Sequence, residues 1–287
     1  DRHFAICERL GIEMIPVPMT DAGPDMDAVE AAVADDAAIK GIWCVPKYSN
    51  PTGATYSDDT ISRLSKMNCK AHDFRVLWDN AYAVHHLGSG PVAVGNLLRE
   101  SQKNGNPDRV LMFGSTSKIT LAGSGVGVLA ASETNIADAL KKASFASIGP
   151  DKINQLRHVR FFGDMDGLLA HMDRLAALIK PKFEAVEEVL ENRLAGKGIA
   201  EWTKPQGGYF VSVDIVDGCA AEVVRRAGDA GVKLTPAGAS FPYGNDPRDR
   251  NIRLAPTMPS VDEIRQAMDV FCTCVEWVCA ERLSDTA

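Results

Sequence analysis

The sequence predicts an α/β fold, with a mostly parallel sheet in the first half of the chain and a smaller α+β domain after it. Three predicted buried strands lie at 41–46, 74–78 and 110–113, the first of them a continuous apolar run bounded by Gly and Pro. Helical patterns separate these runs, which indicates βαβ units. Strands that alternate with helices in this way are typical of a parallel sheet covered by helices.

The second half of the chain has a different pattern. Long helical periodicity begins after residue 150, and Pro181 is expected to break it. Residues 208–215 alternate between apolar and polar, as a half-buried strand does. A last helix is expected over 261–278, because a Ser-x-x-Glu capping box begins at Ser260.

This change of pattern predicts two domains, over residues 1–150 and 151–287. A chain of 287 residues is long enough to bury a core in each. The chain opens in mid-pattern, on a helix-like segment over 2–10 with no strand or N-cap before it. We therefore expect it to be the C-terminal part of a longer protein whose N-terminal part is missing here.

Composition excludes several classes of function. The 31 basic and 38 acidic side chains give a formal charge of −7 without basic clusters, which argues against nucleic-acid binding by this chain. No apolar run approaches the roughly 20 residues that span a membrane. The seven cysteines lie mostly in apolar segments, which favours reduced thiols and a cytoplasmic location. Their spacing does not match zinc ligands, so we expect no metal site.

Polar side chains follow each of the three predicted parallel strands. They are Asn50 in an Asn-Pro-x-Gly turn, then Asp79 and Tyr82, then Ser115, Ser117 and Lys118. The carboxyl ends of parallel strands meet at one edge of a sheet, where ligands bind. Each motif alone is explained by a turn, a helix N-cap or a solvated lysine. It is their order along the chain that indicates a functional site.

This ordered set resembles the fold-type I, class I/II pyridoxal-phosphate (PLP) aminotransferases. Residues 204–210 (Lys-Pro-Gln-Gly-Gly-Tyr-Phe) and 251–254 (Asn-Ile-Arg-Leu) fall where that family has a small-domain strand and its substrate arginine. Residues 79–87 are most similar to a bacterial branch provisionally named aspartate aminotransferases. The resemblance implies a PLP-transferase fold whose large-domain sheet is incomplete here, followed by the small α+β domain.

The resemblance also implies roles for the residues nearest the cofactor ring. Lys118 forms the imine with PLP and later moves a proton between the substrate and the cofactor. Asp79 faces the pyridine nitrogen and stabilises its protonated form. Asn50 and Tyr82 are hydrogen-bond partners of the phenolic oxygen. We assign Lys118, Asp79 and Tyr82 to catalysis.

Phosphate and substrate binding are implied in the same way. Ser115 and Ser117 are expected to donate to the phosphate. Many relatives carry an arginine about eight residues after the lysine, but residues 119–127 contain none. Ser124 is the substitute suggested by its position. Arg253 is expected to bind the substrate α-carboxylate, with Asn50 beside it.

The function implied is amino-group transfer between an amino acid, for which aspartate or glutamate is suggested, and a 2-oxo acid. Relatives place their active sites at a dimer interface, so a homodimer is expected. Two alternatives stay open: the ligand-sensing domain of a winged-helix transcription regulator, and a PLP-dependent β-lyase. Near the site, His85 and His86 are expected to be structural, and Trp43 and Trp78 to pack in the core.

Overall fold

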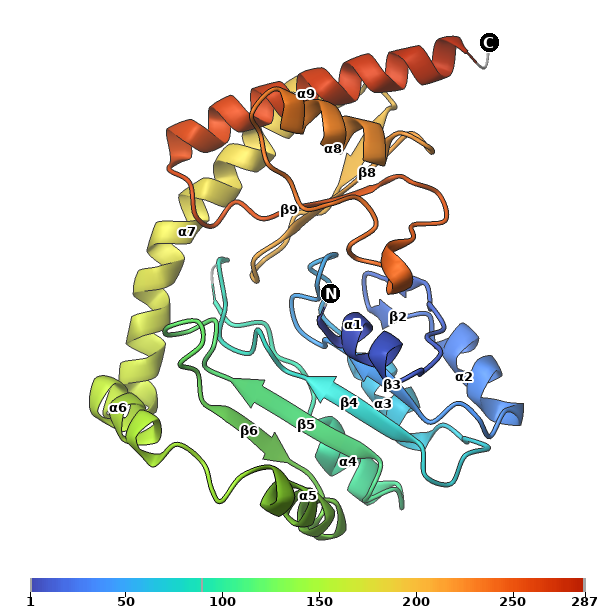
Figure 1. The fold of residues 1–287 in the computed structure, drawn as a ribbon, viewed down its shortest axis with the longest axis vertical. Helices are drawn as coiled ribbons and strands as arrows, with labels where there is room; N and C mark the ends of the chain where they lie inside the picture. The colour runs from blue at the N-terminus through green and yellow to red at the C-terminus, as the bar shows by residue number, and fades with distance from the viewer. Residues whose placement is uncertain (1, 89, 286–287) are drawn as a thin grey trace. The chain divides into compact units, whose positions relative to one another are not determined.

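A computed structural model describes residues 2–88 and 90–285 of the chain. It divides into two compact units, which we name after their sheets (Figure 1). The four-stranded unit comprises Val17–Ser49 and Ala54–Arg174. The three-stranded unit comprises Asp1–Pro16, Asn50–Gly53 and Leu175–Ala287.

Strands and helices alternate in the four-stranded unit. Its elements are β1 (Met19–Thr20), β2 (Gly23–Pro24), α2 (Met26–Asp35), β3 (Gly41–Cys44), α3 (Asp58–Lys66), β4 (Arg75–Asp79), α4 (Leu97–Lys103), β5 (Val110–Ser115), β6 (Gly127–Ala130), α5 (Glu133–Ala146), α6 (Lys152–Phe162) and the start of α7 (Met165–Leu194). The sheet order is β3-β4-β5-β6, with β3–β4 and β4–β5 parallel and β5–β6 antiparallel. The mostly parallel sheet is confirmed.

One face of this sheet carries the core of the unit. Cys44, Val76 and Val110 are fully buried there, together with apolar side chains of α2, α3 and α4. Trp78 lies on this face and is 2% exposed, as expected for core packing. Successive strand residues point to opposite faces, so Trp43 lies on the other face. It is 41% exposed, and the expectation that it packs in the core is therefore wrong.

The three-stranded unit is built on an antiparallel sheet. Its elements are α1 (Arg2–Arg9), the remainder of α7, β7 (Ala200–Trp202), β8 (Val211–Ile215), α8 (Ala220–Asp229), the 3-10 turn η1 (Pro242–Gly244), β9 (Asn251–Leu254) and α9 (Val261–Ser284). The sheet order is β7-β8-β9. Helices α8 and α9 lie together on one side of it (Figure 1). This is the α+β domain expected from the sequence, and the capping box at Ser260 is present.

Helix α7 runs through Pro181 without ending, so the break expected there is wrong. A proline removes one backbone hydrogen bond from a helix. Beyond it, the buried side chains of Phe183, Val186 and Leu190 share one side of the helix and hold the following turns in place. Across the residues that the structure describes, no helix is both long and apolar enough to cross a membrane.

Candidate active site

The predicted polar residues of the four-stranded unit lie at one edge of its sheet. Strands β4 and β5 are parallel, and Asp79 pairs with Phe113 in their register. Asp79 therefore ends β4 close to the point where Ser115 ends β5. Lys118 follows in the turn after β5 and is exposed. The parallel pairing brings together the two strand ends that the sequence singled out.

Asp79 has an electrostatic environment unlike that of a surface carboxylate. Burial raises the pKa of its carboxyl group above the ordinary value, while the positive charge of Lys118 and a hydrogen bond from the Trp43 side chain act in the opposite direction. Asp79 and Lys118 are thus close enough to interact. Trp43 is a member of this site that the sequence did not reveal, because an apolar strand run does not tell which residue faces away from the core.

Tyr82 is buried beside Lys118. Lys118 Nζ lies 5.0 Å from the centre of the Tyr82 ring, a cation–π distance, and Tyr82 is 3% exposed. His85 packs edge-on against the same ring, at 5.5 Å between centroids. Burial lowers the pKa of His85 to about 4, so the ring is uncharged at neutral pH. His86 Nδ1 lies 2.6 Å from the Tyr48 hydroxyl.

The serines of the turn form a compact hydroxyl pair. Ser115 Oγ donates to Ser117 Oγ at 2.8 Å and accepts from the Ser117 N–H at 3.0 Å. Gly125 lies directly against this pair: a Cβ there would come within 2.9 Å of Ser117 N and Cα. Ser124 precedes Gly125, and its carbonyl accepts from Asn154 Nδ2 at 2.8 Å. The two arms of the loop between β5 and β6 are therefore in contact at Ser117.

Arg253 and Asn50 meet in the three-stranded unit. Arg253 lies on β9, is 8% exposed, and donates from Nη1 to Asn50 Oδ1 at 3.0 Å. Its guanidinium carbon lies 4.6 Å from the centre of the Phe210 ring. A buried arginine held by an amide on one side and an aromatic face on another has a fixed orientation. The sequence placed these two residues 203 positions apart, and the fold joins them.

The Asn-Pro-x-Gly turn also contacts the second motif of this unit. Gly53 has φ +77°, and a Cβ there would come within 2.7 Å of Pro205 Cβ. Both the backbone conformation and the close approach require glycine. Pro205 belongs to the Lys-Pro-Gln-Gly-Gly segment, so two motifs that are far apart in the sequence pack against each other.

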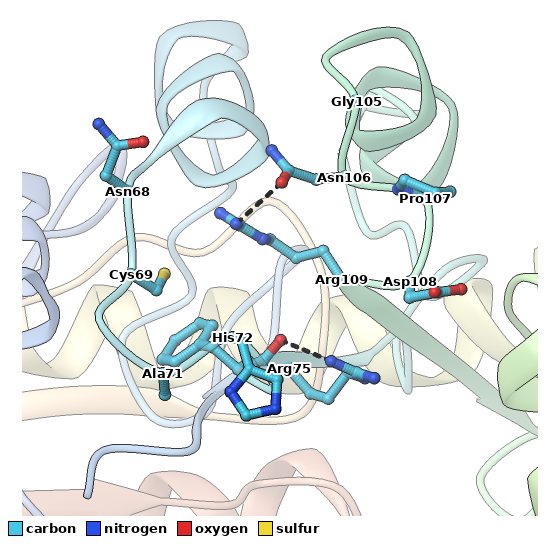
Figure 2. Close-up of a pocket in the computed structure, with 11 residues that line it drawn as sticks. Asn68, Cys69, Ala71, His72, Arg75, Gly105, Asn106, Pro107, Asp108 and Arg109 are labelled. Atoms are coloured by element: carbon cyan, nitrogen blue, oxygen red, sulfur yellow. Dashed lines mark hydrogen bonds between the residues drawn. The ribbon is translucent and has the colours of Figure 1, made fainter. Parts of the chain in front are cut away.

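A pocket of about 380 Å³ lies at the end of the four-stranded sheet opposite to Asp79 and Ser115 (Figure 2). It is lined by residues that precede β4 and β5, among them His72 and Arg109. Arg109 donates to Met67 O at 2.6 Å and to Asn106 Oδ1 at 3.2 Å, and so closes the end of α3. We attribute this pocket to the packing of these segments and not to a functional site.

A mostly parallel sheet followed by a smaller α+β domain is the architecture of the aminotransferases to which this chain is similar. The chain belongs to the aspartate amino-transferase family, whose model matches residues 1–286. The family expected from the ordered motifs is therefore confirmed.

Two relatives support this at high identity. A Mycolicibacterium smegmatis protein that bears the name of an aminotransferase is 56% identical over 283 residues, and an aspartate aminotransferase of Corynebacterium glutamicum is 50% identical over 285 residues. Each match covers 99% of this chain and 66% of the relative. The chain thus spans slightly less than two thirds of the length of these relatives.

Solved structures agree on the fold. The crystal structure of an aspartate transaminase from Corynebacterium glutamicum superimposes with a TM-score of 0.95 at 50% identity, covering 98% of this chain and 66% of that one. An α-aminoadipate aminotransferase from Thermus thermophilus, solved in complex with N-(5'-phosphopyridoxyl)-L-leucine, reaches 0.80 at 23% identity, covering 94% and 67%. The PLP fold-type I architecture is confirmed.

Proposed function

We propose that this protein transfers an amino group between an amino acid and a 2-oxo acid, with PLP as its cofactor. The observation that carries the proposal is the juxtaposition of Asp79 and Lys118 at the carboxyl edge of a parallel sheet. Members of the aspartate amino-transferase family use PLP, and relatives at 50–56% identity bear aminotransferase names. Both findings support the proposal.

The residues of the four-stranded unit fit the chemical groups of PLP. Lys118 offers a primary amine for the aldehyde, and Asp79 offers a half-buried carboxylate for the ring nitrogen. The Ser115–Ser117 pair offers hydroxyl donors for the phosphate. Ser124 belongs to the loop arm that touches this pair, which supports its proposed part in phosphate binding in place of the usual arginine.

Bound PLP supplies an electron sink that stabilises negative charge on the substrate α-carbon. Asp79 would face the ring nitrogen and favour its protonated form, which strengthens that effect. Lys118 Nζ would move the proton at the substrate α-carbon as a general base and acid. The ring of Tyr82 lies beside the Lys118 amine and positions it, while the Tyr82 hydroxyl is assigned to the phenolic oxygen.

Arg253 is proposed to bind the substrate α-carboxylate. A guanidinium offers two parallel N–H donors to a carboxylate, which a lysine cannot do. Asn50 Oδ1 accepts from Arg253, so the Asn50 amide keeps its Nδ2 donors for the cofactor or the substrate. Burial of Arg253 at 8% exposure strengthens its electrostatic pull on an anion.

The finer assignments stay proposals drawn from the sequence. Aspartate and glutamate are the suggested substrates, and the name of the Corynebacterium glutamicum relative supports aspartate. We keep the proposed domain boundary at residue 150. The residues assigned to the cofactor phosphate and ring nitrogen precede it, and Arg253, assigned to the substrate, follows it. A homodimer and a cytoplasmic location also stay proposals drawn from the sequence.

A half-reaction assay tests the proposed function. The protein is loaded with PLP and mixed with each amino acid in turn, while the absorbance of the bound cofactor and the release of 2-oxo acid are followed. Transamination bleaches the band and releases one 2-oxo acid per site without added acceptor. A β-lyase regenerates the band and releases product repeatedly, and a sensing domain binds PLP without releasing product. Either of the last two outcomes overturns the proposal.

A further inference from the structure

Three of the six histidines in the chain bond to the turn that carries Lys118. The turn covers residues 116–120, directly after β5. His85 comes from the loop after β4, His158 from α6 and His171 from α7. All of them lie in the four-stranded unit, so three separate elements converge on one five-residue segment.

The contacts of His158 fix its tautomer. Nδ1 lies 2.8 Å from Asn154 O, and a carbonyl only accepts, so Nδ1 carries the proton and Nε2 of the neutral ring is an acceptor. Nε2 lies 3.0 Å from both Thr116 Oγ1 and Thr120 Oγ1. Thr120 Oγ1 donates to Thr116 O, and Thr116 Oγ1 accepts from Val126 N–H. The Thr116 hydroxyl therefore keeps its proton for His158 Nε2, whereas the Thr120 hydroxyl gives its single proton to Thr116 O and has none left for Nε2.

The other two histidines donate to backbone carbonyls of the turn. His171 Nε2–H donates to Ile119 O at 2.9 Å, and His85 Nε2–H donates to Lys118 O at 3.3 Å. Carbonyls in a turn lack the partners that a helix or strand supplies, and buried ones need a replacement. The imidazoles supply it here, and the low pKa of His85 keeps that ring uncharged beside the lysine at neutral pH.

Helix α6 holds the other arm of the same loop as well. Asn154 lies one helical turn before His158, and its Nδ2 donates to Ser124 O at 2.8 Å. Because Thr116 N–H also donates to Val126 O, the loop is closed at both ends and anchored from one helix. The backbone that carries Lys118 is thus constrained from several directions.

We propose that His85, His158 and His171 are positioning residues, which fix the turn and thereby the direction in which the Lys118 side chain leaves it. These rings bond to backbone carbonyls and threonine hydroxyls of the turn, so they position Lys118 through its backbone. The inference rests on the function proposed above, since it takes Lys118 as the lysine that binds PLP. A hydrogen bond of ordinary net strength corresponds to about fivefold in an equilibrium constant.

If the rings only fill space, a variant that keeps an aromatic ring should bind PLP as the unaltered protein does. His171 packs edge-on against Phe161 and Phe162, at 5.2 and 5.7 Å between centroids. His171→Phe keeps an aromatic ring in this cluster but donates nothing to Ile119 O. His171→Gln loses the ring but keeps an N–H donor at about the reach of Nε2. The pair separates the hydrogen bond from the packing.

The experiment compares both variants with the unaltered protein loaded with PLP. The readouts are the dissociation constant of PLP and the pH midpoint of the absorbance change of the bound cofactor. This midpoint depends on how Lys118 is positioned. We expect His171→Phe to weaken PLP binding about fivefold and to shift the midpoint, and His171→Gln to restore both to within about twofold. His72→Phe, an exposed histidine at the pocket of Figure 2, is the matched control and leaves both unchanged.

Two results overturn the inference: a Phe variant that equals the unaltered protein, or a Gln variant that is as impaired as the Phe variant. If His171→Phe does not fold, the same two substitutions at His85 repeat the comparison at Lys118 O. A failure of the proposed function is seen in the unaltered protein itself, which then either forms no absorbing complex with PLP or forms one without transaminating in the half-reaction assay.

Discussion

Replacement of Arg253 by lysine tests how the substrate carboxylate is bound. The change keeps the positive charge on β9 but removes the planar, two-pronged donor. It also removes the Nη1 donation to Asn50 Oδ1 at 3.0 Å and the stack on the Phe210 ring at 4.6 Å. The substitution therefore separates the effect of the positive charge from the effect of the guanidinium geometry.

The expected magnitude follows from these contacts. Loss of the second prong of a carboxylate clamp costs about 2 kcal/mol, as a hydrogen bond to a charged group does. Loss of the aromatic stack costs about 1 kcal/mol at a buried site. Together about 3 kcal/mol corresponds to a reduction of kcat/KM of roughly a hundredfold.

The assay is the rate of the half-reaction with aspartate or glutamate at increasing concentration. Arg250→Lys is the matched control, because Arg250 lies just before the same strand and is paired with Asp214 at 2.7 Å. It is expected to leave kcat/KM within about twofold, because a lysine keeps the positive charge opposite Asp214 and Asp217. If Arg253→Lys lowers kcat/KM by less than threefold, Arg253 is not the carboxylate clamp.

Three further predictions concern the four-stranded unit. Gly125→Ala should push the loop away from Ser117 and weaken PLP binding at least tenfold. Gly127→Ala is the control, because a Cβ there meets open space, and it should leave PLP binding unchanged. Titration with PLP measures both variants. Asp79→Asn should raise the melting temperature of the cofactor-free protein at neutral pH, because burial disfavours the charged carboxylate. The same change should weaken PLP binding. An unchanged or lower melting temperature would contradict the prediction on stability. His85, whose pKa falls from 6.5 to about 4, should make the free energy of unfolding drop by about 3 kcal/mol as the pH falls between these values, since only the unfolded chain binds the proton. Urea unfolding at pH 5 and 7 should show less of this dependence in His85→Gln, and an equal dependence would show that the ring is not responsible.

The sequence predicted the parts of the fold that depend on local pattern. The apolar run before Asp79 and the run before Ser115 became neighbouring parallel strands, as short apolar runs separated by helical segments predict. The capping box at Ser260 was also predicted, since its side chains act within one turn. These features need no knowledge of distant residues.

Other features depend on tertiary contacts and escaped prediction. Helix α7 passes Pro181 because buried side chains beyond it support the helix. Trp43 reaches Asp79 only because β3 pairs with β4 in one particular register. His158 and His171 lie about 40 and 50 residues after the Lys118 turn, and nothing in their neighbourhood signals that they bond to it. Periodicity and motifs carry no information on such pairings.

The most direct test of the account is the site at which PLP attaches. The protein is incubated with PLP, reduced with borohydride to make the attachment permanent, digested, and analysed by mass spectrometry. The account predicts one cofactor adduct per chain, on the peptide that contains Lys118, and none in Lys118→Ala. An adduct on Lys47, whose pKa is lowered by burial in the same unit, or adducts spread over several surface lysines, would contradict it.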